Sequence, residues 1–173
     1  MQNFIVFVLS NFTLTFFILS IISAAISLFI KRKHLNKALT IEVIFSHFLL
    51  FNIGFSLLYN FVMHVFFGDI TAKFIGWADS PFQIELGFAS LGFAILGILS
   101  FWASSGFRAA TIIAPAIFLW GAAGVHIYNM VATHNFAPGN AGVIFWTDIF
   151  IPLLGFILLY LQYKTPIRKI PKR

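Results

Sequence analysis

The side chains best suited to chemistry in this sequence are the ionisable groups inside long apolar stretches. A charged group is costly in such a place, so its presence calls for a structural or functional reason. Histidines and carboxylates can transfer protons, bind a cation or hydrogen-bond to a polar ligand. Six such residues interrupt the apolar runs: Glu42, His47, His64, Glu85, His126 and Asp148.

The composition predicts an integral membrane protein. Of the 173 residues, 60% are hydrophobic and 9% are charged, whereas a typical soluble domain has about 25% charged residues. The net charge of +6 does not indicate a nucleic-acid partner, because the basic residues gather at the ends of apolar runs and in the C-terminal tail. The partner that this pattern indicates is the lipid bilayer. The absence of cysteine excludes disulfides, iron–sulfur clusters, haem–thiolate ligation and cysteine zinc sites within this chain.

Five apolar runs predict an all-α bundle of five transmembrane helices that forms a single domain, residues 1–173. Each run is long enough to cross about 30 Å of hydrocarbon, which takes about 20 residues. The runs are separated by short polar segments, of which 68–80 and 133–142 are expected to be loops. The predicted spans are 4–30, 41–67, 81–103, 109–132 and 143–163.

The lysines and arginines predict the orientation of the bundle. Four lie in the linker between the first two spans, Arg108 lies in the turn before the fourth span, and five follow the fifth span. Lys73 alone lies on the other side. By the positive-inside rule, the N-terminus is expected outside and the C-terminus in the cytoplasm, as in a multi-pass protein of the inner (plasma) membrane.

With this orientation, four of the ionisable residues lie at similar depth near the outer face: His64, Glu85, His126 and Asp148. Counted along their spans, they lie roughly 4.5 to 9 Å below the outer boundary. Two amides lie at the same level. The candidate ligand-binding residues are therefore His64, Gln83, Glu85, His126, Asn129 and Asp148.

Three interpretations of this cluster remain open. In the first, the cluster binds or passes a small polar ligand, a cation or a proton. In the second, the polar groups only hold the bundle together, as interhelical hydrogen bonds do in membranes, and the protein is a structural or accessory subunit of a membrane complex. In the third, the protein is a metal-dependent intramembrane enzyme that holds zinc or iron. The metal ligands would then be His64, Glu85, His126 and Asp148.

Other residues are expected to have structural roles. Glu42 lies near the start of its span, where the helix dipole favours an anion, and His47 is expected to be a core histidine with a hydrogen-bond partner. Trp77 and Trp146 are expected in the aromatic belt at the interface. Small residues allow membrane helices to approach closely. The third span contains several small residues, including Gly87, Gly92 and Gly97. We expect them to pack against other helices within the bundle. The alternatives are a face that forms a homo-oligomer and a contact with a membrane partner subunit.

Glu85 and His126 are predicted to pair. Their spans are joined by a short turn around Gly106, which predicts that the two helices are antiparallel neighbours. Glu85 is about as far before this turn as His126 is after it, which places both within roughly 2 Å of the same height. Each would then lower the cost of burying the charge of the other.

The polar segment before the third span also carries a family resemblance. Gly76-Trp77 followed by Ser80-Pro81-Phe82-Gln83-x-Glu85 resembles a pattern in a family of small bacterial membrane proteins of unknown function. The resemblance continues with Gly124-x-His126 and with Asn140-Ala141-Gly142 through Asp148 and Pro152, from residue 76 to about 155. It implies a protein of four or five spans and indicates neither an activity nor a cofactor.

Overall fold

The computed structural model describes residues 2–165, which contain no strand, and 86% of the structure is helix. Five helical segments are long and apolar enough to cross a membrane, which confirms the predicted all-helical class and the number of spans. These segments are α2 (Phe12–Ile30), the second span Lys37–Phe66, α6 (Phe82–Leu99), α7 (Ser105–Ala132) and the fifth span Pro138–Lys164. The second span comprises α3 (Lys37–Phe48), η2 (Leu49–Phe55) and α4 (Ser56–Phe66), and the fifth comprises α8 (Pro138–Ala141) and α9 (Val143–Lys164).

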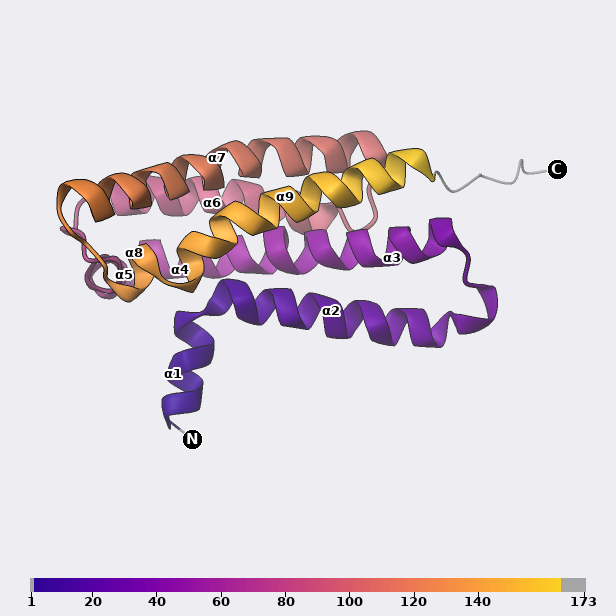
Figure 1. Cartoon of the computed structure of the whole chain (residues 1–173), viewed down its shortest axis with the longest axis horizontal. Coiled ribbons are helices and arrows are strands. Elements are labelled where there is room, and N and C mark those ends of the chain that lie inside the picture. Colours follow the sequence, from indigo (N-terminus) through magenta and orange to yellow (C-terminus); the bar gives the residue numbers. More distant parts are fainter. Residues whose placement is uncertain (1, 166–173) are drawn as a thin grey trace.

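The second span is the most buried of the five and lies at the centre of the bundle. It packs against α6 on one side and α2 on another, while α7 packs mainly against α9 (Figure 1). Apolar side chains recur on it at intervals of four residues, so they share one helix face. The core cluster around this face includes Phe45, Leu49, Ile53, Leu57, Ile112 and Ile151.

The predicted first span is too long, because the helix breaks at Asn11. The helix α1 (Gln2–Ser10) turns steeply away from α2, as Figure 1 shows. At the break, Asn11 leaves the helical conformation, and its Nδ2 donates to the carbonyl of Phe7 at 2.9 Å. The Thr15 hydroxyl donates to the carbonyl of Val8 at 3.0 Å. These polar side chains satisfy carbonyls that the end of a helix leaves free.

Both segments that were expected to be loops contain short helices at the same end of the bundle. One is α5 (Gly68–Ile75), which ends at Gly76 in the left-handed conformation, with φ 79°, as glycine readily does. The other is α8, which begins with proline at its first position. Asn135 links the two segments, since its Nδ2 donates to the carbonyls of Ile75 and Gly76 at 3.0 and 3.2 Å. We call this end the α5 end.

An ion pair between a buried arginine and a partly exposed glutamate lies at the opposite end of the bundle. Arg108 is 1% exposed, and its two terminal nitrogens each lie 2.8 Å from an oxygen of Glu42. It also donates to the carbonyls of Ser100 and Phe101, both at 2.9 Å. The Gln162 amide donates to the same carboxylate at 2.6 Å. The interpretation of Glu42 as a helix-dipole residue was therefore wrong, because its carboxylate connects the second, fourth and fifth spans.

Glycines of the third span pack against the second span. A Cβ on Gly97 would lie 2.7 Å from the Cα of Gly54, and one on Gly87 would lie 2.5 Å from Cγ2 of Val65. A Cβ on Gly92 would meet nothing within 4 Å. Packing within the bundle therefore accounts for Gly87 and Gly97, since only glycine allows this close approach.

Candidate functional site

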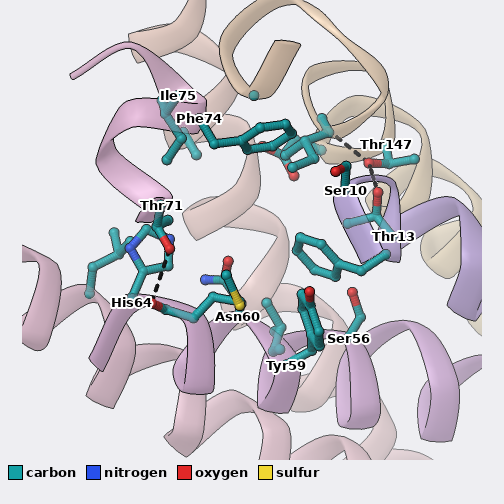
Figure 2. Close-up of a pocket in the computed structure, with 18 of the residues that line it drawn as sticks. Ser10, Thr13, Ser56, Tyr59, Asn60, His64, Thr71, Phe74, Ile75 and Thr147 are labelled. Carbon is teal, nitrogen blue, oxygen red and sulfur yellow. Dashed lines mark hydrogen bonds between the residues drawn. The ribbon is translucent and has the colours of Figure 1, made fainter. Parts of the chain in front are cut away.

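A cavity of about 610 Å³ lies between the helices at the α5 end. Its walls come from α1, α2, the second span, α5, α7 and the fifth span, with Leu86 of α6, and they are mostly apolar (Figure 2). This volume is within the range of small-molecule sites, which are typically apolar clefts with a few well-placed polar groups. Two sets of polar groups line this cavity, one on the second span and one on α7 and α9, and further polar side chains come from Ser10, Thr13, Thr71 and Trp77.

The first set is a stripe of polar residues at intervals of four along the second span. Asn52, Ser56, Asn60 and His64 all line the cavity. Residues four apart share a helix face, and twelve residues of helix extend over about 18 Å. One wall of the cavity is therefore polar along much of its length. We call these four residues the polar stripe.

Residues of α6 hold in place the part of the polar stripe nearest the α5 end. His64 Nδ1 is hydrogen-bonded to Gln83 Oε1, and Asn60 Nδ2 donates to Ser90 Oγ at 2.9 Å. His64 and Gln83 are both buried. Because Gln83 offers its oxygen to Nδ1, the proton of the neutral His64 ring lies on Nδ1 and the lone pair lies on Nε2. Gln83 thus lies behind His64 and does not line the cavity.

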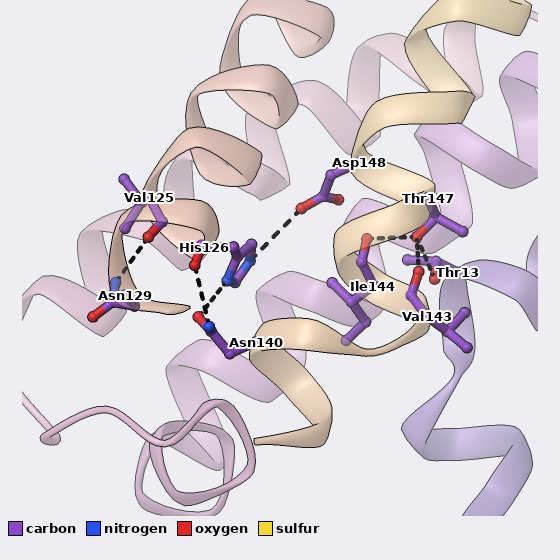
Figure 3. A network of polar contacts seen from close by, with 9 residues as sticks. All are labelled: Thr13, Val125, His126, Asn129, Asn140, Val143, Ile144, Thr147 and Asp148. Carbon is purple, nitrogen blue, oxygen red and sulfur yellow. Dashed lines mark hydrogen bonds and ion pairs between the residues drawn. The ribbon is translucent and has the colours of Figure 1, made fainter. Parts of the chain in front are cut away.

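The second set centres on His126 and Asp148, which approach each other across α7 and α9 (Figure 3). His126 Nε2 lies 3.8 Å from Asp148 Oδ2, and both side chains are buried. This separation is longer than a hydrogen bond. The two groups can form an ion pair or share a single proton, and in both cases the pair as a whole is neutral.

Asn140 fixes the orientation of the His126 ring. Its Nδ2 donates to the carbonyls of Asn135 and His126, at 2.8 and 3.3 Å, which leaves Oδ1 as an acceptor. Oδ1 therefore accepts a hydrogen bond from His126 Nδ1 at 2.7 Å. The ring thus presents Nε2 to Asp148. Asn140 is fully buried.

Trp77 does not lie in an exposed belt but covers His126. Its ring stacks on the imidazole with a centroid distance of 5.7 Å and an interplanar angle of 29°. Its indole nitrogen is buried and has no hydrogen-bond partner among the described residues. Trp146, in contrast, is 54% exposed, in agreement with a position at the interface.

The structure brings together four of the six predicted site residues. His64, His126 and Asp148 line the cavity, and Gln83 supports His64. Glu85 is exposed and lies outside the cavity. The Nδ2 of Asn129 donates to the carbonyl of Val125 in its own helix, at 2.9 Å, and this side chain does not line the cavity either.

The predicted pair of Glu85 and His126 is not formed between the described residues, in which His126 faces Asp148. Two residues at the same height on neighbouring helices meet only when their side chains point toward each other. Gln83 is buried against the second span, and a residue two positions later points about 200° away around the helix. The Glu85 side chain therefore points away from the bundle and is exposed.

Three contributors were not foreseen as site residues. Asn52 and Ser56 continue the spacing of Asn60 and His64 by four residues, so the sequence did contain a signal for them. Asn140 carried no such signal, because its contact with His126 depends on how α8 folds back against α7. His47 lies outside the cavity and is bonded to Ser23 at 2.9 Å, as expected for a core histidine.

The geometry gives little support to a metal centre. Among residues 2–165, no group of three or more histidines and acids is placed to hold a metal ion. Of the four predicted ligands, Glu85 points away from the other three.

Comparison with known proteins gives a family but no activity. No curated protein and no solved structure matches the chain. A family model, described as a family of unknown function (DUF6790), matches residues 10–168. Because this match covers nearly the whole chain, the protein belongs to the DUF6790 family.

Proposed function

We propose that this protein binds a small amphipathic molecule in the cavity at the α5 end of the bundle. The observation that carries the proposal is the combination of mostly apolar walls with two sets of buried polar groups, the polar stripe and the pair formed by His126 and Asp148. A molecule with an apolar body and a polar end matches both kinds of wall.

An amphipathic ligand fits this cavity better than a bare ion. An ion that leaves water for an apolar cavity needs a compensating charge and several polar ligands. Among residues 2–165, the one carboxylate that lines the cavity is Asp148, and it already faces His126. Of the alternatives considered for the sequence, ligand binding is therefore better supported than ion transport or metal-dependent catalysis.

The proposed location is a bacterial inner membrane, with the N-terminus outside and the C-terminus in the cytoplasm. The bacterial origin rests on the resemblance carried by the Gly76-Trp77 to Glu85 motif. The orientation rests on the basic residues, of which Lys73 alone belongs to the α5 end. Arg108 contributes little to this bias because it is paired with Glu42, but the linker and the tail still supply nine basic residues. The cavity would then face the outer leaflet.

Photolabelling in lipid nanodiscs tests whether the cavity binds an amphiphile. The probe is an alkylglycerol ether with a decyl chain and a diazirine in that chain. Labelled peptides are mapped by mass spectrometry. We expect labelling of buried wall residues such as Leu57 and Leu119, which lipid outside the bundle does not reach.

Two variants in which an alanine is replaced by phenylalanine provide a test and its control. Ala122 lines the cavity, and Ala122→Phe is expected to reduce labelling of Leu57 and Leu119 by about ten-fold, because the ring occupies the space of the probe. Ala89 is exposed on α6 and outside the cavity. Ala89→Phe should therefore leave the labelling unchanged. Absence of labelling at both wall residues, or equal labelling in all three proteins, would contradict the proposal.

A further inference from the structure

The cavity wall offers a ligand hydrogen-bond acceptors beside donor groups such as the hydroxyls of Ser10 and Ser56. Several hydroxyl groups of the wall already donate within the protein. Tyr59 donates to the carbonyl of Leu9 at 3.2 Å, Thr71 to that of Met63 at 3.0 Å, and Thr147 to Thr13 Oγ1 at 2.8 Å.

Asn60 and His64 are the best-placed acceptors. Asn60 uses its Nδ2 to bond Ser90, so its Oδ1 is directed into the cavity, as Figure 2 shows. His64 uses its Nδ1 to bond Gln83, which leaves the lone pair of Nε2 without a partner among the described residues. The two residues are four apart, so the two acceptors lie on one face of α4.

The rim of the cavity differs from its interior. Val6 and Leu9 of α1 and Ile70 of α5 line the cavity and are also 56%, 49% and 54% exposed, so they mark the place where the cavity meets the surroundings. All three are apolar. The buried part of the wall contains the polar stripe. A bound amphiphile would therefore place its polar end inside the bundle and its apolar chain at the rim, between α1 and α5.

We propose that the ligand is a single-chain lipid with a hydroxyl-bearing head group, whose hydroxyls donate to Asn60 Oδ1 and His64 Nε2. This assignment deepens the proposed function and depends on it. A hydroxyl group supplies the proton that both acceptors require and brings no net charge. A charged ammonium head also has donors, but it would need a counter-charge in this apolar space, and Asp148 already faces His126.

Three probes separate these possibilities, and all carry the same decyl chain and diazirine. One has the two free hydroxyls of the alkylglycerol, the second is its dimethyl ether, and the third is a primary amine. The ether keeps the oxygens of the head but has no proton to donate, and because it is larger by two methyl groups the variants below separate the effect of size from that of the hydrogen bonds. We expect the alkylglycerol to label Leu57 and Leu119 about 25-fold more than the ether, because each of the two hydrogen bonds, at ordinary net strength, provides about five-fold. We also expect it to label them more than the amine does.

Two variants locate the contact. Asn60→Leu removes one of the two acceptors and should lower the preference for the alkylglycerol over the ether to about five-fold, because His64 Nε2 still accepts one hydroxyl. Ser90→Ala removes the hydrogen bond between α4 and α6 but keeps the Asn60 oxygen, so the preference should remain. This control distinguishes a role in ligand binding from a merely structural one. If Asn60→Leu does not fold, the ratio of labelling by the alkylglycerol to labelling by the ether in the unchanged protein still tests the hydroxyl assignment.

The outcomes distinguish this inference from the proposed function. If no probe labels the wall residues, the proposed function fails. If the probes label them but the ether equals the alkylglycerol, or the amine labels them more strongly, the amphiphile site stands and the hydroxyl assignment is overturned. An equal fall of the preference in Ser90→Ala and in Asn60→Leu would also overturn it.

Discussion

Arg108 and Glu42 are 66 residues apart in the sequence, and they form a bidentate ion pair at the end of the bundle opposite the cavity. Two parallel N–H···O bonds give such a pair both strength and a defined geometry. Two backbone carbonyls accept the other donors of Arg108. The guanidinium therefore joins the turn after α6 to the start of the second span.

Loss of the Arg108 side chain should strongly destabilise the protein. Removal of one partner of a fully buried pair typically costs about 3–5 kcal/mol, and the loss here should be somewhat smaller because the Glu42 side chain is 30% exposed. Arg108→Ala should therefore lower the thermal unfolding temperature in nanodiscs markedly. Arg108→Lys should restore little of it, because an ammonium cannot bond two carboxylate oxygens and two carbonyls in this planar arrangement. Lys73→Ala, at an exposed position, provides the control; equal stability of the Lys73 and Arg108 variants would contradict the prediction.

Much of the fold could be predicted from the sequence, because the length and apolar character of a span are local properties. The five spans and the short turn between the third and fourth spans required only the order of residues. The break at Asn11 was missed because the residues on both sides of it are apolar and helical in character. Contacts between distant segments, such as that of Arg108 with Glu42, could not be read from local pattern.

The candidate site was predicted in part for the same reason. Rise per residue is regular, so counting placed His64, His126 and Asp148 at one level, and all three line the cavity. The direction of a side chain depends on which helices are neighbours, and this is not a local property. Glu85 therefore shared the predicted level but faces outward.

A double-mutant cycle should show coupling between His126 and Asp148. His126→Gln and Asp148→Asn each leave one polar group without its partner, so the double variant should lose less stability than the sum of the two losses. Groups in contact typically show coupling of about 0.5–3 kcal/mol. The same cycle with Glu85→Gln and His126→Gln should be additive, because the structure does not place them in contact. Thermal unfolding of the purified variants measures both cycles, and an additive His126–Asp148 cycle would refute the pairing.

Two glycines of α6 form a matched pair of sites for testing the contact with the second span. Gly97→Ala should destabilise the protein by about 1–3 kcal/mol, the usual cost of overpacking, because its Cβ would collide with the backbone of Gly54. Gly92→Ala introduces the same methyl group into open space and should leave stability unchanged or slightly raised. If both variants unfold at the same temperature, the close approach of Gly97 to Gly54 is not present in the membrane.

The proposed orientation predicts that the cavity and the C-terminal tail lie on opposite sides of the membrane. Because the chain has five spans, its N-terminus and C-terminus lie on opposite sides of the membrane. The basic residues of the linker and the tail favour the cytoplasm. Alkaline phosphatase, which is active only outside the cytoplasm, should therefore be inactive when fused after Arg173. The same reporter fused after Thr133, before α8, should be active. Green fluorescent protein, which fluoresces when it remains in the cytoplasm, should give the reverse pattern at the two sites. Phosphatase activity at Arg173 together with fluorescence at Thr133 would invert the topology, and the cavity would then face the inner leaflet.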